Sequence, residues 1–185
     1  MPDGTVGSGP GRGSTALEAT VGLLSADNPR DTALAWLFVL VQFALLVAII
    51  LLPPGDAWPV PDWLATVGLA LEVVGVGVLL VALVNLGRSL TPLPTPVPHG
   101  ELRVGGLYHW VRHPIYAGIL ALVVGATVRS SSLAVAAAAA ALAGWFMLKA
   151  RWEEQHLTRR YPGYAAYAAV TPRFVPGWPV RARSS

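Results

Sequence analysis

The chain has 185 residues, of which 54% are hydrophobic and only 12% charged, against about 25% charged in an ordinary soluble domain. This composition argues against a soluble enzyme and against a disordered protein, and the absence of cysteine excludes disulfides, zinc–thiolate sites and cysteine nucleophiles. In an apolar chain, the net charge of +3 bears on membrane orientation, and no nucleic acid partner is expected.

The N-terminal part contains a polar stretch and then an apolar run. Residues 1–32 are rich in glycine, serine and threonine, which predicts a disordered tail. No basic stretch adjoins the first apolar run, so the pattern does not indicate a signal peptide. Residues 33–52 are apolar except for Gln42, and as a helix they span about 30 Å, the thickness of the hydrocarbon core. They predict a transmembrane helix.

Residues 63–87 predict a second span. Its glycines Gly68, Gly75 and Gly77 would allow a neighbouring helix to approach closely. Glu72 lies inside the span, where an ionisable residue is by default a candidate functional residue. Because Glu72 is near the start of the span, it could instead lie in the extracellular third of the membrane and serve helix packing.

Residues 88–113 are polar and contain prolines at positions 92, 94, 96 and 98. Such a proline pattern forbids helix and favours an extended segment. Long internal loops of this kind tend to be functional.

Two further apolar runs follow, over residues 114–130 and 132–150. Residues 129–132 predict a tight hairpin between them, and the second helix should continue as a charged helix to about Tyr161. The predicted fold class is therefore all-α: an integral membrane bundle of about four helices over residues 33–176, with a tail over 177–185.

The basic residues predict the orientation of this bundle. Twelve of the thirteen Lys and Arg residues precede the first span, lie in the long loop, or lie at or after the end of the last apolar run, and only Arg129 lies on the opposite side. The positive-inside rule then places both termini and the long loop in the cytoplasm, in what we expect to be a bacterial cytoplasmic membrane.

Polar residues from two distant segments should emerge on this same face, which predicts one cytoplasmic-side site. Pro114 suits the first position of a helix, so Arg112 and His113 would lie at its positive end, which favours an anion. The alternative is a basic interfacial anchor. Glu153 and Glu154 could bind an ammonium or a ribose hydroxyl, or could lie on a solvated helix face with an ion pair from Lys149 to Glu153.

A metal site is not predicted. Glu153-x-x-His156 has the spacing of a carboxylate-bundle metal site, but such a site needs a second pair and further carboxylates on facing helices.

Several motifs together resemble one family. Residues 105–118, Gly-Gly-Leu-Tyr-His-Trp-Val-Arg-His-Pro-Ile-Tyr-Ala-Gly, resemble the Gly-x-Tyr…Arg-His-Pro-x-Tyr-x-Gly motif of the isoprenylcysteine carboxyl methyltransferases. These are related to the membrane phospholipid N-methyltransferases. The proline-rich segment before the motif and the pattern Glu153-Glu154…Tyr161-Pro-Gly…Pro172-Arg173 after it fit as well.

The resemblance implies an enzyme that transfers a methyl group from S-adenosylmethionine to a lipophilic acceptor, either an isoprenylcysteine-type carboxylate or a lipid amine. It implies catalytic roles for His113 and Arg173, with Arg173 positioning the acceptor. The implied cofactor-binding residues are Tyr108, Arg112, His113, Pro114, Tyr116, Gly118, Glu153 and Glu154. The cofactor's carboxylate would face Arg112 and His113, and its ammonium one of the glutamates.

Two other function classes remain open from the sequence. One is a non-catalytic membrane protein that binds a lipid or a partner, and the other is a membrane reductase of related architecture. Binding of S-adenosylmethionine or of a nicotinamide would separate them. The oligomeric state is not predicted.

Overall fold

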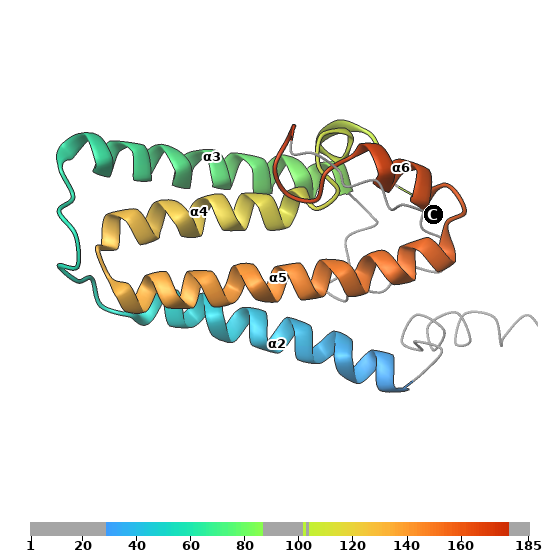
Figure 1. Ribbon diagram of the computed structural model, residues 1–185, viewed down its shortest axis with the longest axis horizontal. Helices are drawn as coiled ribbons and strands as arrows, with labels where there is room; N and C mark the ends of the chain where they lie inside the picture. Colours follow the sequence, from blue (N-terminus) through green and yellow to red (C-terminus); the bar gives the residue numbers. More distant parts are fainter. Residues whose placement is uncertain (1–28, 87–101, 103, 178–185) are drawn as a thin grey trace, which may run out of the picture.

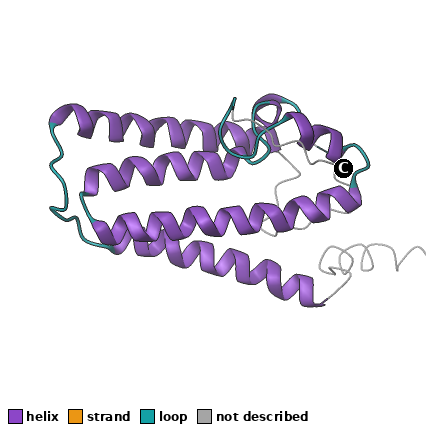
Figure 2. Cartoon of the chain, viewed as in Figure 1, coloured by secondary structure: helices purple, strands orange, loops and turns teal. Residues whose placement is uncertain are grey.

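The computed structural model describes residues 29–86, 102 and 104–177. The helices are α2 (Pro29–Leu51), α3 (Asp62–Leu86), the short 3₁₀ helix η2 (Gly106–His109), α4 (Pro114–Ser130), α5 (Leu133–Arg160) and α6 (Tyr164–Val170). The described part contains no strand, and the predicted all-helical membrane class is confirmed (Figure 2).

Three helices, α2, α3 and α5, are long and apolar enough to cross a membrane, and the 17-residue α4 is shorter. The protein is an integral membrane protein. In α5 the charged end continues the apolar run as one helix to Arg160, as the sequence predicted. The connection between α4 and α5 is the expected tight hairpin.

The N-terminal boundary differs from the prediction. Helix α2 begins at Pro29, so residues 29–32 are helical and do not belong to a disordered tail. A proline at the first position and Asp31 in the first turn are ordinary helix-start signals, and they outweigh the polarity of this stretch. The rest of the predicted tail, the proline-rich segment and the end of the C-terminal tail lie outside the described residues.

The bundle is built from two helix pairs, α3 with α4 and α2 with α5 (Figure 1). Glycines on facing sides bring α3 and α4 together: a Cβ added at Gly75 would lie 2.6 Å from the Gly118 carbonyl oxygen. Gly68 likewise packs against α4, at the carbonyl of Gly125. Gly77, predicted to share this role, has open space where a side chain would be, so that part of the prediction is wrong.

One end of the bundle is closed by backbone hydrogen bonds. The amides of Gly55 and Ala57 donate to the carbonyls of Ser130 and Ser131, at 2.8 and 2.9 Å. Ser131 has a left-handed backbone conformation, with φ of 49°, which turns α4 into α5. The loop after α2 thus fixes the α4–α5 turn, and the polar site lies at the other end of the bundle.

Candidate functional site

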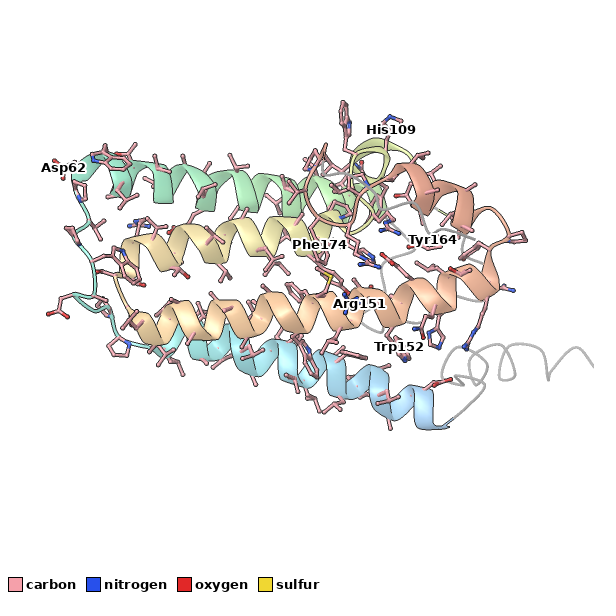
Figure 3. All side chains as sticks on the ribbon, viewed as in Figure 1. Asp62, His109, Arg151, Trp152, Tyr164 and Phe174 are labelled. Carbon is pink, nitrogen blue, oxygen red and sulfur yellow. The ribbon has the colours of Figure 1, made fainter. Side chains whose placement is uncertain are left out.

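The site is formed where three segments meet: the start of α4, the charged part of α5, and the chain after α6. The amide of Arg112 donates to the carbonyl of Pro172 at 2.8 Å, and that of His113 to the carbonyl of Arg173 at 3.0 Å. Figure 3 shows Tyr164 and Phe174 at this end of the bundle, opposite Asp62. These backbone bonds bring Arg173 to the Arg-His-Pro motif.

Glu154 is the most heavily paired residue of the site. Arg173 donates to both of its carboxylate oxygens, from Nε at 2.8 Å and from a terminal nitrogen at 2.7 Å. Arg112 lies 3.4 Å and His113 Nε2 3.2 Å from the same carboxylate. A buried carboxylate is tolerated when a planar arginine fork and further donors satisfy it, so Glu154 holds three basic side chains in place.

Glu153 has a different set of partners. The Tyr116 hydroxyl donates to it at 2.5 Å, and His113 Nδ1 lies 3.4 Å away. Neither arginine of the site pairs with it among the residues described. His113 therefore lies between two carboxylates, and only its protonated form can donate to both at once.

Aromatic rings fix this arrangement from the membrane side. The Tyr116 ring stacks between those of His113 and Phe146, with centroid distances of 5.3 and 4.6 Å. The Phe174 ring is tilted against that of His113 and meets that of Tyr116 edge-on, with centroid distances of 6.0 and 6.3 Å. Such packing leaves Tyr116 one orientation, with its hydroxyl on Glu153.

Two further tyrosines, Tyr108 and Tyr167, lie next to this cluster. The Tyr167 hydroxyl donates to the carbonyl oxygen of Tyr108. Burial raises the pKa of both phenols from 10.0 to about 12, and the nearby charge of Glu153 adds to the effect at Tyr108. Both side chains are therefore neutral hydrogen-bond donors at physiological pH. Burial also raises the pKa of Tyr164.

The structure brings together seven of the predicted site residues: Tyr108, Arg112, His113, Tyr116, Glu153, Glu154 and Arg173. Pro114 is buried as the first residue of α4, and no side-chain hydrogen bond caps that helix end. Gly118 is placed differently. Its Cα faces α3, where an added Cβ would lie 2.8 Å from the Gly75 carbonyl oxygen, so its visible role is helix packing.

Sequence reasoning missed one polar contact at the site. Lys149 does not form the ion pair with Glu153 that the solvated-face alternative implied. Its ammonium donates to Gln42 Oε1 of α2 at 2.7 Å and lies 5.3 Å from the centroid of the Tyr116 ring. A signal was present in the sequence, because Gln42 and Lys149 interrupt two apolar runs and Lys149 is the only lysine of the chain.

The other polar candidates lie outside this cluster. Arg129 donates to both oxygens of Glu72 at 2.9 Å, which gives Glu72 a packing role between α3 and α4. His156 is held by the Trp152 carbonyl at 2.9 Å and lies 3.9 Å from Asp31 of α2.

Comparisons with known proteins identify a family and similar chains. The sequence model of the family described as phospholipid methyltransferase matches residues 63–163. The Protein-S-isoprenylcysteine O-methyltransferase B of Arabidopsis thaliana is 30% identical over 153 residues, which cover 80% of this chain and 74% of the relative.

A solved structure has a similar fold. It is a eukaryotic intramembrane Ras methyltransferase, isoprenylcysteine carboxyl methyltransferase, which superposes with a TM-score of 0.54 at 20% identity and covers 91% of this chain. The chain spans about half the length of that protein, since the match covers 54% of it. Arg173 lies beyond the end of the family match at residue 163, yet it completes the cluster around Glu154.

Proposed function

The chain belongs to the phospholipid methyltransferase family of membrane enzymes, which use S-adenosylmethionine, and from this premise we propose that it methylates a lipophilic acceptor. One observation carries the proposal: two adjacent glutamates, two arginines and a histidine form one buried cluster at one end of a membrane bundle. A lipid-binding or partner-binding module would have no need for such a buried, mixed-charge arrangement.

The cluster suits the zwitterionic methionine part of S-adenosylmethionine. Glu153 is the better partner for an ammonium, since Glu154 already pairs with Arg173 and Arg112. Arg112 Nε is buried without a hydrogen-bond partner among the described residues, so it remains available for a carboxylate at the uncapped start of α4. Glu154 then positions the basic groups, and Tyr108, Tyr116 and Pro114 shape the pocket.

When bound, the cofactor supplies the methyl group: its carbon–sulfur bond breaks, the electron pair stays on sulfur, and a bond to the acceptor forms. The protein's part is mainly to align the acceptor and to exclude water. Arg173 is fixed by Glu154 but remains 31% exposed at its side chain, so it can contact the acceptor head. An amine acceptor would in addition need His113 or a glutamate to accept its proton.

We further propose that both termini and the site face the cytoplasm and that the acceptor enters sideways from that leaflet. The site lies at the end where α2 begins and α5 ends, and most of the basic residues in the described part of the chain lie toward this end (Figure 1). Reporter fusions at residue 57 and at the C-terminus should report opposite sides of the membrane. Fusions on the same side would contradict the orientation and the number of spans.

The decisive experiment is transfer of a labelled methyl group from S-adenosylmethionine to extracted host lipids and to prenylated thiols. We expect label in a lipophilic product with the wild type and its loss in Glu153→Gln. Glu72→Gln, a matched change away from the site, should keep the activity. An inactive wild type that binds a nicotinamide would instead indicate the reductase.

A series of acceptors that differ only in tail length tests the entry route. The KM should fall as the tail grows. Each buried methylene adds up to about 0.8 kcal/mol to the free energy of acceptor binding, until the groove is full. Full activity on a head group without a tail would refute lateral entry and indicate a water-soluble acceptor.

A further inference from the structure

Lys149 is the only lysine among thirteen basic residues, and it is one of the most buried side chains, with 4% exposure. Its ammonium is held by a neutral group, the Gln42 amide oxygen. None of the ion pairs found among the described residues involves it. The charge of Glu153 acts on Lys149 without a direct ion pair. A buried cation that no carboxylate contacts directly is costly inside a membrane protein, and such residues are as a rule functional.

The position of Lys149 suits an interaction with the acceptor rather than with the polar end of the cofactor. It precedes Glu153 by one turn of α5, so it lies about 6 Å deeper in the bundle, on the same helix face. Its neighbours at this depth are aromatic: the Tyr116 ring lies beside it, and Phe146 is one turn further in. A lipophilic acceptor that approaches from the membrane meets this level before the carboxylates.

The charges around the site are not balanced. Arg112, Arg173 and Lys149 are three cationic side chains, and Glu153 and Glu154 are two carboxylates. S-adenosylmethionine carries a sulfonium, an ammonium and a carboxylate, so its binding adds one more positive charge. In surroundings of low dielectric, this excess favours an acceptor with a negative head.

We propose that Lys149 is a specificity-determining residue, positioned by Gln42, whose charge makes the site prefer an anionic acceptor head of the carboxylate type over a protonated amine. The inference rests on the proposed function and narrows its substrate class. It also suits the chemistry, because a carboxylate oxygen can attack the methyl carbon directly, whereas an ammonium must first lose a proton. Lys149 acts through its field and need not touch the acceptor.

The test compares two acceptors with the same apolar tail, one ending in a carboxylate and one in a primary amine. Lys149→Met removes the charge at similar length, and Gln42→Glu keeps the lysine but supplies a counter-ion of the same shape. Both should lower the ratio of kcat/KM for the carboxylate to that for the amine by about tenfold or more. Lys149→Arg, which keeps the charge, and the distant Glu72→Gln should keep the ratio.

A binding measurement tests the inference without turnover. The cofactor-free protein in detergent is titrated with an unreactive alkyl sulfonate and with the alcohol of equal tail length. The wild type should prefer the sulfonate, and Lys149→Met and Gln42→Glu should lose that preference.

The proposed methyl-transfer function and the proposed role of Lys149 can be refuted separately. If the wild type methylates neither acceptor, the proposed function fails, and the sulfonate preference still decides the role of Lys149. If methyl transfer occurs but the wild type prefers the amine, or the ratio is the same in all variants, the role of Lys149 is overturned.

Discussion

The bundle contains two arginine–glutamate pairs that look alike as pairs and differ in their surroundings. Arg129 and Glu72 join α3 to α4, with 45% and 23% of their side chains exposed, and no other charged residue joins them in the described part of the chain. Arg173 and Glu154 are 31% and 11% exposed, and Glu154 also contacts Arg112 and His113. We therefore expect loss of the first pair to affect one helix contact, and loss of the second to affect the whole site.

Neutralising Glu154 should have the largest effect. In Glu154→Gln, three basic side chains lose their shared carboxylate, and breaking a buried ion pair typically costs about 3–5 kcal/mol of stability. Unfolding in detergent should show a loss of this size, together with loss of methyl transfer. Glu72→Gln should cost less, because the amide oxygen can still accept from Arg129 and no second basic side chain depends on Glu72. Equal losses in the two variants would remove the distinction between the pairs.

His113 should show a functional effect more clearly than a structural one. His113→Ala removes the group between the two glutamates and part of the proposed anion site. Loss of a charge-assisted hydrogen bond typically lowers affinity by about ten- to a hundredfold, which calorimetric titration with S-adenosylmethionine would measure. Wild-type affinity in this variant would contradict a direct role of His113 in binding the cofactor.

Gly118 tests whether a residue of the family motif serves packing or binding. In Gly118→Ala, the new Cβ meets the backbone of α3, and overpacking of this kind costs about 1–3 kcal/mol. The affinity of the folded protein for the cofactor should change less than about twofold. Gly77→Ala is the matched control, because it has open space and should not be destabilised. A loss of affinity without a loss of stability would return Gly118 to the binding site.

The fold could be read from the sequence because the lengths of the apolar runs dictate helices of fixed length. The charged cluster was also predictable in outline, since Arg112, Glu153 and Arg173 must emerge at the same end of the bundle. The pairing within it was not, because a hydropathy pattern does not give the rotation of a helix about its axis. The contact of Lys149 with Gln42 joins residues 107 positions apart and depends on that rotation.

The smallest expected effect concerns Tyr167, which is linked to the site by one hydrogen bond and not by a charge. Tyr167→Phe removes the bond to the Tyr108 carbonyl, which should lower the free energy of unfolding by about 0.5–1.5 kcal/mol. The pKa of Tyr167 is about 12 in the folded protein, above its ordinary value of 10.0, so folding favours the neutral phenol.

This shift makes the stabilisation by Tyr167 depend on pH in a defined direction. Because the pKa is raised on folding, the contribution is complete below pH 10 and is lost as the pH rises through about 12. The stability difference between wild type and Tyr167→Phe should therefore be constant from about pH 7 to 9 and shrink at higher pH, as unfolding in detergent would show. The titration of the folded wild type can be compared with that of Tyr167→Phe to identify the Tyr167 phenol. If that phenol titrates near its ordinary pKa, the burial that raises its pKa is contradicted.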